Sequence, residues 1–173
     1  MGSVKLAVYP GTFDPITLGH LNVAERACKL FDRLVIAVGI NSVKEPWFTP
    51  EERCEMIREA ARERGLENIE KTTYTGLTVS FAKKLGARVV IRGVRPLADI
   101  PAELTMMMAN RRLAPEIETL FLIADGELAH VSSSLIKEIA GASECDEKSL
   151  RSFVPRNVAE AVMKRIQERK ARG

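Results

Sequence analysis

Along most of its 173 residues, the chain alternates short apolar segments with longer amphipathic ones. The apolar run Arg33 to Ile40 is uninterrupted, as expected for a strand buried on both faces of a parallel sheet. The expected strands are Leu6 to Tyr9, Arg33 to Ile40, Ile69 to Tyr74, Ala87 to Ile91 and Glu118 to Ile123. The third is the least apolar, which favours a place near an edge. Five strands, each followed by a helix, predict an α/β fold with a doubly wound, five-stranded parallel sheet.

The segments between the strands carry the spacing and the end residues of helices. The clearest start has Thr49 as the N-cap, Pro50 at the first helical position and Glu52 completing a capping box, with Gly65 as the stop. The expected helices are Leu21 to Leu30, Pro50 to Arg64, Thr78 to Leu85, Glu103 to Leu113, Ser132 to Ala140 and Asn157 to Arg169. We expect residues 1–173 to form one domain, with a polar linker at 142–149 and a C-terminal helical extension over about 142–173.

Composition excludes several classes of protein. No apolar stretch reaches the roughly 18 residues that span a bilayer, and Pro10 breaks the first apolar run too early for a secretory signal, so we expect a cytoplasmic protein with no membrane contact. Three distant cysteines without CxxC spacing suggest no disulfide framework or zinc knuckle, and two histidines cannot supply a three-ligand zinc site. The net charge of +3 suits an anionic small molecule and is too small to favour nucleic acid.

Residues suited to binding phosphate follow the first expected strand. Ligands of such sheets bind at the carboxyl ends of the strands, near the point where the strand order reverses. In the loop 10–20, Gly11 is expected to permit a tight turn. Gly19 is expected to let a phosphate approach the helix that opens at His20, where free amides and the helix dipole favour an anion.

Cations and hydroxyl groups follow three other strands. Taken singly, Lys44, Arg92 and Arg95 are each most simply explained as solvated loop cations. Together with a helix N-terminus, the three predict a site for a polyanion. The arginines offer planar forks for phosphate oxygens, whereas the lysine is a mobile point charge. The run Ser132 to Ser134 adds hydroxyls and amides at a helix start, although N-capping needs only Ser132.

Two motifs carry a resemblance to a known family. Gly11 to His20 resembles the (T/H)xGH signature of the nucleotidylyltransferase superfamily, which follows a GxFDP segment, and Ser132 to Lys137 resembles its ISSSxxR/K motif. Within that superfamily, Thr17, the opening YPGTFDP and the segment IRGVR are typical of the phosphopantetheine adenylyltransferase family. The similarity extends from about Lys5 to about Met163.

The resemblance implies a Rossmann-like nucleotidylyltransferase fold and a reaction. Members of the family transfer the adenylyl group of ATP to 4′-phosphopantetheine, giving dephospho-coenzyme A and pyrophosphate, the penultimate step of coenzyme A biosynthesis. It further implies Mg²⁺ carried by the nucleotide rather than by protein ligands, coenzyme A as a feedback inhibitor, and a homohexamer. The chain departs from the family pattern at Pro101 and Ala102, where many relatives have an aromatic residue in place of the alanine.

The resemblance also implies site residues, among which His20 matches the family's transition-state stabiliser. The catalytic set is His20, Lys44 and Arg95. The phosphopantetheine-binding set is Thr12, Lys44, Thr78 and Arg92. The ATP-binding set is Thr12, Phe13, His20, Gly93, Val94, Arg95, Glu103, Leu128, Ala129, His130, Val131, Ser132, Ser133 and Ser134. For Asp14, an outer contact to magnesium and a simple turn-forming role both remain open.

Three alternatives stay open on the sequence. A related transferase could act on nicotinamide mononucleotide or glycerol phosphate, but such relatives usually carry HxGH, so Thr17 disfavours this. The second alternative is a regulatory module that binds a nucleotide without turnover. Binding alone needs fewer cations than this chain carries, which disfavours this alternative. A nucleic-acid binder is suggested by the basic C-terminal helix, but Glu160 and Glu168 interleave its cations, which indicates a solvated face.

Overall fold

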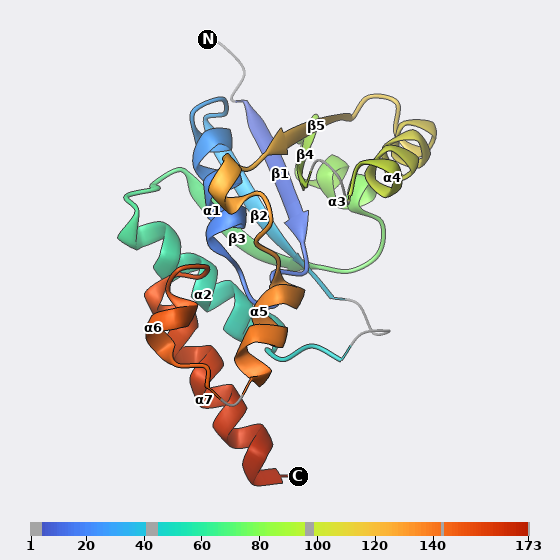
Figure 1. Cartoon of the computed structure of the whole chain (residues 1–173). Helices are drawn as coiled ribbons and strands as arrows, with labels where there is room; N and C mark the ends of the chain where they lie inside the picture. The colour runs from blue at the N-terminus through green and yellow to red at the C-terminus, as the bar shows by residue number, and fades with distance from the viewer. Residues whose placement is uncertain (1–4, 41–44, 96–98, 143, 173) are drawn as a thin grey trace.

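The computed structural model describes residues 5–40, 45–95, 99–142 and 144–172, and its centre is one sheet (Figure 1). All the strand pairs are parallel, and the strand order is β3-β2-β1-β4-β5. The strands are β1 (Leu6–Gly11), β2 (Arg33–Gly39), β3 (Ile69–Tyr74), β4 (Val89–Val94) and β5 (Glu118–Ile123). The predicted five-stranded, doubly wound parallel sheet is confirmed, and β3 lies at an edge as expected.

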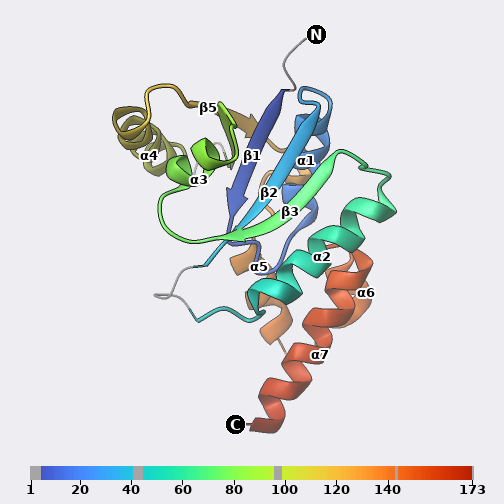
Figure 2. The same ribbon diagram turned by 180° about the vertical axis from the view of Figure 1, so that it is seen from behind.

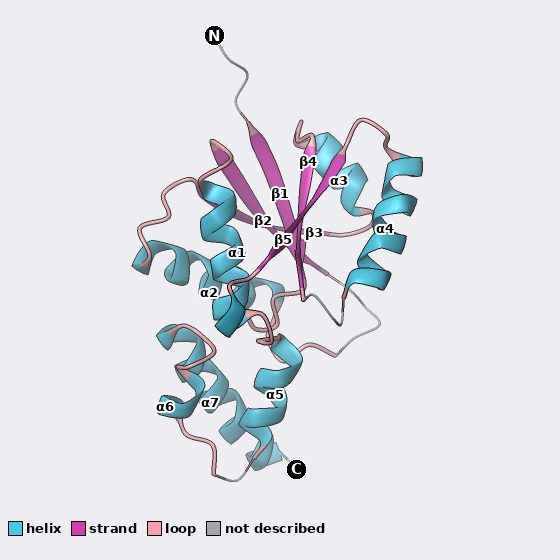
Figure 3. Cartoon of the chain, turned by 45° about the horizontal axis from the view of Figure 1, so that its top comes forward, coloured by secondary structure: helices cyan, strands magenta, loops and turns pink. Residues whose placement is uncertain are grey.

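Helices cover both faces of the sheet (Figure 3). Helices α1 and α2 lie on one face, and α3 and α4 lie on the other, while α5, α6 and α7 pack together beyond the first face (Figure 2). The helices are α1 (Leu18–Cys28), α2 (Pro50–Glu63), α3 (Thr78–Lys84), α4 (Ile100–Leu113), α5 (Ser133–Gly141), α6 (Glu147–Leu150) and α7 (Arg156–Arg172), with a 3₁₀ turn at Gly126–Leu128. Among the described helices, none combines the length and the apolar character needed to cross a membrane.

Strand β2 shows why its sequence is apolar without interruption. Leu34, Ile36 and Val38 belong to the core shared with α1, α2, α5 and α7. Val35 and Ala37 point to the opposite face and belong to the core shared with α3. Successive residues of a strand face opposite sides, so a central strand with helices on both faces must be apolar at every position.

The structure differs from the sequence prediction at the end of β1. The strand continues through Pro10 and Gly11, which pair with β2, whereas its pairing with β4 stops at Val8. Proline has no N–H to give to a ladder, and it lies here where β1 and β4 have already separated. The cleft described below opens at this separation.

A second difference lies in the segment predicted to be a polar linker. Part of it forms α6, whose N-cap Asp146 accepts a hydrogen bond from the amide of Ser149 at 2.8 Å. A helix of four residues is too short to show a 3.6-residue period, so the pattern gave no signal for it. The organisation of residues 1–173 as one domain stays a prediction.

The capping box predicted at the start of α2 is present and can be tested. Thr49 accepts the Glu52 amide at 3.2 Å, and the Glu52 carboxylate accepts the Thr49 amide at 2.7 Å. We expect Thr49→Ala to lower the free energy of unfolding by about 1 kcal/mol, measured by urea titration. The control Ser80→Ala, at an exposed position of α3, should change it by less than about 0.5 kcal/mol. Equal effects of the two variants would contradict this role of the cap.

Candidate active site

A cleft of about 560 Å³ opens at the carboxyl end of the sheet, where β1 and β4 separate. We call it the main cleft. Its walls come from the loop after β1, the end of β2, α2, β4 and the start of α5. The lining residues are Tyr9, Pro10, Gly11, Thr12, Phe13, Asp14, His20, Gly39, Glu45, Pro46, Arg53, Arg92, Gly93, Ser133, Ser134 and Lys137.

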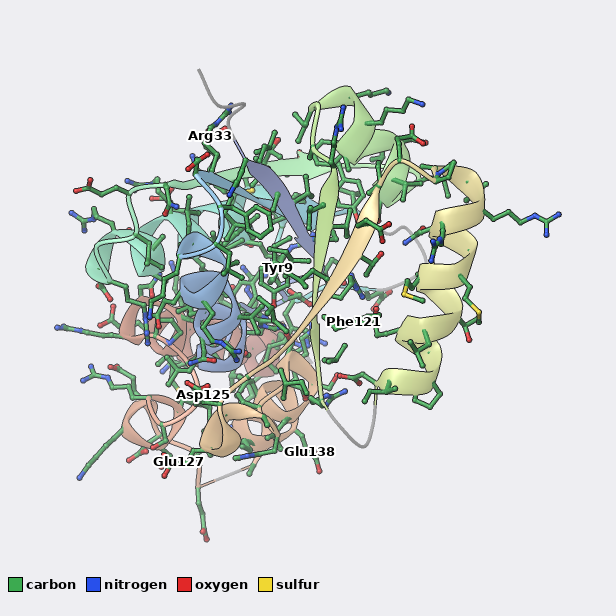
Figure 4. The ribbon with its side chains drawn as sticks, turned by 90° about the horizontal axis from the view of Figure 1, so that it is seen from above. Tyr9, Arg33, Phe121, Asp125, Glu127 and Glu138 are labelled. Carbon is green, nitrogen blue, oxygen red and sulfur yellow. The ribbon has the colours of Figure 1, made fainter. Side chains whose placement is uncertain are left out.

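A smaller hollow of about 140 Å³, which we call the side cleft, adjoins the main cleft. The two share Tyr9, His20 and Gly93. Tyr9 lies near the middle of the molecule, among the side chains between the sheet and the helices (Figure 4). The other residues of the side cleft are Gly19, Val23, Val94, Arg95, Asp99, Ala124, Leu128, Ala129, Val131 and Ser132.

The two clefts bring together most of the site residues predicted from the sequence. Those in the main cleft are Thr12, Phe13, His20, Arg92, Gly93, Ser133 and Ser134. Those that line only the side cleft are Val94, Arg95, Leu128, Ala129, Val131 and Ser132. Segments that are distant in sequence therefore converge on one continuous site, with His20 at its junction.

Three of the predicted site residues, Thr78, Glu103 and His130, line neither cleft. Lys44 lies outside the described residues. Thr78, at the start of α3, shares a hydrogen bond of 2.9 Å with the hydroxyl of Tyr74. His130 is exposed, with its ring 6.5 Å from that of Phe153. Glu103, on α4, pairs with Arg92, which lines the main cleft.

The start of α1 fixes the orientation of the His20 ring. Thr17 caps the helix by accepting the His20 amide at 3.3 Å, and its own amide donates to Nδ1 of His20 at 3.1 Å. An Nδ1 that accepts a hydrogen bond carries no proton, so this bonding assigns the proton of the neutral ring to Nε2. His20 can therefore offer one N–H to a ligand in either cleft.

The surroundings of His20 keep its ring neutral. Burial first, and then the charges of Arg95 and Arg92, together lower the pKa of His20 to about 4. Both causes disfavour a second proton on the ring. At neutral pH the residue is therefore a hydrogen-bond donor and carries no charge.

This titration can be followed by NMR, because the chain has only two histidines and a His130→Gln variant assigns the signals. We expect the His20 ring protons to titrate near pH 4 in the free protein, and nearer neutral pH when pyrophosphate is added, because nearby anions favour the charged ring.

The same pKa shift affects stability. Because the pKa of His20 is lower in the folded state than in the unfolded state, His20 makes the folded state less stable as the pH falls from 6.5 toward 4. An unshifted titration near 6.5 would contradict the assignment.

The two glycines of the first loop act differently from the sequence interpretation. Gly11 makes no left-handed turn; a Cβ there would lie 2.8 Å from the ring of Phe13, so it makes room for that ring. The left-handed residue is Phe13 itself, with φ of 48°. A Cβ on Gly19 would lie 3.0 Å from the carbonyl oxygen of Leu128, so this glycine makes room for the chain's own backbone. Both glycines therefore serve close packing, Gly11 beside the Phe13 ring that contacts His20 and Gly19 beside the Leu128 carbonyl oxygen.

The amides at the start of α1 are also less available than the sequence suggested. The amide of Leu18 donates to the carbonyl oxygen of Phe153 at 2.8 Å, and that of His20 is used by Thr17. Of the first three amides of α1, those of Leu18 and His20 already have partners. The prediction of a free helix N-terminus is therefore wrong for these two amides. The side chain of His20, rather than the end of the helix, is the donor that faces both clefts.

The two predicted arginines of the cleft are each paired with an acid near α4. Arg92 donates to Glu103 through Nε at 2.7 Å and through Nη2 at 2.5 Å, while its Nη1 donates to the carbonyl oxygen of Pro10 at 3.1 Å. Arg95 donates through Nε and Nη2 to Asp99 at 2.9 and 2.7 Å. These bonds from Arg95 lower the pKa of Asp99. The pairs hold both forks in place, and an arriving phosphate must compete with or share them.

Comparison with known proteins agrees with this geometry. The family model described as cytidylyltransferase-like matches residues 8–139. The phosphopantetheine adenylyltransferase of Rhodopirellula baltica is 54% identical over 156 residues, covering 90% of this chain and 86% of that protein. The one of Carboxydothermus hydrogenoformans is 42% identical, covering 95% of this chain and 98% of that protein. The chain belongs to the phosphopantetheine adenylyltransferase family.

A solved structure shows the same fold at low sequence identity. The nicotinic acid mononucleotide adenylyltransferase of Plasmodium falciparum, in complex with NaAD, superposes with a TM-score of 0.61 at 13% identity and covers 96% of each chain. At this identity the likeness shows the fold alone. It agrees with the Rossmann-like nucleotidylyltransferase fold expected from the two sequence motifs.

The three serines of the second family motif have three different environments. Ser132 caps α5 by accepting the amide of Leu135 at 3.1 Å, as predicted. Ser133 donates its hydroxyl to the carbonyl oxygen of Pro15 at 2.8 Å, tying α5 to the first loop. Ser134 is exposed and lines the main cleft. Two of the three hydroxyls thus have structural partners, and the amides of Ser133 and Ser134 and the Ser134 hydroxyl are the groups left for a ligand.

Asp14 has a larger role than either sequence interpretation gave it. The residue is 3% exposed, and its carboxylate accepts the amides of Trp47 and Phe48 at 2.9 Å each. The ammonium of Lys137, on α5, pairs with the same carboxylate. Asp14 therefore joins the first loop, the segment before α2 and α5. Three donors occupy it, which disfavours a contact to magnesium.

Sequence reasoning missed Arg53. This arginine of α2 is 3% exposed and lines the main cleft. It donates to the carbonyl oxygens of Thr12 at 2.8 Å and Thr49 at 3.3 Å. No carboxylate among the described residues pairs with it, so its positive charge adds to the attraction of the cleft for anions. Its position on the buried stripe of α2, with Met56 and Ile57, is the signal that could have revealed it.

Within the described ranges, no three His, Cys, Asp or Glu side chains form a group that could hold a metal ion. Asp14 of the main cleft, Asp99 of the side cleft and Glu103 are paired with cations, whereas Glu45 also lines the main cleft and brings a negative charge to it. The described part of the site therefore offers donors and positive charge to a phosphate-bearing ligand.

Proposed function

We propose that this chain transfers the adenylyl group of ATP to 4′-phosphopantetheine, giving dephospho-coenzyme A and pyrophosphate. The main cleft takes phosphopantetheine, and the nucleotide lies in the side cleft and along the edge of the main cleft that Ser133 and Ser134 form. The observation that carries the proposal is the position of His20, whose ring lines both clefts and can donate one N–H where they meet. Family membership supplies the two substrates.

In this proposal the acceptor phosphate lies at the end of β4. Arg92 and Thr12 of the main cleft align it, with Arg53 adding positive charge beneath. Lys44 completes this set by its match to the family. Thr78 is proposed to contact the acceptor through its backbone, because its hydroxyl bonds to Tyr74.

The nucleotide is assigned to the side cleft and the edge that it shares with the main cleft. Arg95 and the amides of Ser133 and Ser134 hold the leaving pyrophosphate. Leu128, Ala129 and Val131 provide an apolar wall. Phe13 supports the His20 ring edge to face, with the ring centroids 5.1 Å apart. Glu103 is proposed to act on the nucleotide side through its pair with Arg92. His130 is assigned to the ATP site by its match to the family.

No strong general base is needed for this reaction. The attacking oxygen belongs to a phosphate monoester, whose second pKa is about 6, so it is already ionised near neutral pH. The difficulty is electrostatic, because one anion must approach the α-phosphorus of another. Positioning and charge neutralisation therefore dominate. The N–H at Nε2 of His20 donates to a phosphate oxygen as charge moves toward the pyrophosphate.

We further propose that Mg²⁺ enters as the complex with ATP and keeps several of its waters, as this ion commonly does. Coenzyme A, which shares the phosphopantetheine portion, is proposed to inhibit by occupying the main cleft. We place the reaction in the cytoplasm.

The proposed homohexamer finds support in α4, which stands at the side of the sheet (Figure 4) and has no buried residue. Its exposed apolar side chains include Leu104, Met106, Met108 and Leu113. Another copy of the chain could cover such a patch.

His20→Ala should lower kcat by about 10²- to 10³-fold, the effect of removing one well-placed donor. Because the native group is neutral and donates from Nε2, His20→Gln should retain more activity than His20→Ala. Steady-state pyrophosphate release measures both, and circular dichroism checks the fold. If His20→Ala and the unchanged protein had equal kcat values, the proposed role of His20 would be wrong.

The function itself is tested by the choice of acceptor. With ATP and magnesium, phosphopantetheine should release pyrophosphate at least about 10³-fold more efficiently than nicotinamide mononucleotide or glycerol phosphate, since the latter two leave polar groups of the site unpaired. Mass spectrometry should identify dephospho-coenzyme A. Turnover with either of the other acceptors instead would replace the proposed substrate.

A further inference from the structure

Helix α7 lies beyond residues 8–139, the part of the chain matched by the family model, yet it reaches a wall of the main cleft. That wall is the segment Glu45–Phe48, which we call the cleft wall. Glu45 and Pro46 line the main cleft and do not line the side cleft. Figure 2 shows α7 running alongside α2, the helix that follows this wall.

Arg165 of α7 holds the outer side of the cleft wall. Its Nη1 donates to the carbonyl oxygen of Trp47, and its guanidinium carbon lies 4.9 Å from the centroid of the Phe48 ring. Its Nη2 donates to the Glu52 carboxylate at 2.6 Å, one turn into α2. The Arg165 side chain therefore contacts the Trp47 carbonyl oxygen, the Phe48 ring and a carboxylate of α2. Hydrogen bonds from a charged donor are stronger than those from a neutral donor, and the cation over the ring adds a further attraction.

Arg169, one turn further along α7, supports the same wall by a different contact. Its guanidinium carbon lies 5.4 Å from the centroid of the Trp47 ring. The ammonium of Lys137 lies 5.6 Å from the same centroid. The indole is therefore held by cations from both α5 and α7.

The inner side of the cleft wall is fixed by Asp14, which accepts the amides of Trp47 and Phe48. The wall is consequently clamped between a buried carboxylate of the first loop and two arginines of α7. Loss of one side of this clamp leaves the backbone at Glu45 and Pro46 free to shift, and a displacement of about 1 Å in a substrate-positioning element can be costly.

We propose that Arg165 and Arg169 are positioning residues for the acceptor: by holding the cleft wall they set the affinity for phosphopantetheine and leave that for ATP unchanged. The inference rests on the proposed function for the identity of the two substrates. The clamp itself does not depend on that function, and this allows the two to be tested separately.

The test compares Arg165→Gln, Arg165→Lys and Arg169→Gln with the control Arg156→Gln. Arg156 also lies on α7 and pairs with Glu160 at 2.8 Å, so this control loses the same charge and an ion pair away from the wall. We expect Arg165→Gln to raise the KM for phosphopantetheine about tenfold, and the KM for ATP by less than about twofold. Arg165→Lys should give a smaller rise, since lysine cannot reproduce the fork. Arg169→Gln, which leaves every hydrogen bond of Arg165 in place, should also raise the acceptor KM alone.

A second measurement uses Trp47, the single tryptophan of the chain. Acrylamide quenching of its fluorescence should increase in Arg165→Gln and Arg169→Gln and should be unchanged in Arg156→Gln. Equal rises in both KM values, or acceptor KM values that match the control, would overturn the positioning role. Unchanged quenching would overturn the clamp. If the unchanged protein releases no pyrophosphate with phosphopantetheine, the proposed function fails, and the quenching result still decides whether α7 holds the wall.

Discussion

The separation of β1 from β4 is the constraint on which the site depends. The sheet grows from β1 in both directions, and the ladder between the two strands ends at Val8 and Val90. Beyond this point the backbone groups that face each other need other partners, and Arg92 supplies one by donating to the carbonyl oxygen of Pro10. The opening in the sheet thus becomes the floor of the main cleft, and a cation predicted for substrate binding also completes the backbone there.

The charges of the site are held in pairs before any ligand arrives. Arg92, Arg95 and Lys137 each face one carboxylate, and these are Glu103, Asp99 and Asp14 respectively. Such pairing lowers the cost of keeping cations in a partly buried cleft, and it keeps the guanidinium forks from adopting other rotamers. Two of the three acids lie at or in α4, a helix without a buried side chain. The proposed binding of phosphate groups therefore involves a helix that has no buried residue.

Much of this could be predicted from the sequence, and the reasons differ from feature to feature. The uninterrupted apolar run of β2 and the capping residues at Thr49 and Glu52 are local signals, so the fold class and the start of α2 were predictable. The convergence of His20, Arg92 and Arg95 followed from their places after parallel strands. The contacts of Asp14 with Trp47, Phe48 and Lys137 join residues 33 to 123 positions apart, and no local pattern encodes them. The family motifs marked the glycines, but only the coordinates show that their neighbours are the Phe13 ring and the Leu128 carbonyl oxygen.

In the proposed mechanism, the uncharged state of His20 has a consequence for the direction of the reaction. An imidazolium at this position would attract pyrophosphate by its full charge and slow its departure, whereas a neutral N–H contributes a single directional bond that breaks easily. The same bond is available when pyrophosphate re-enters and attacks the dinucleotide-like product. The proposed mechanism is accordingly well matched to a freely reversible exchange, whose net direction is set by whatever removes pyrophosphate from solution.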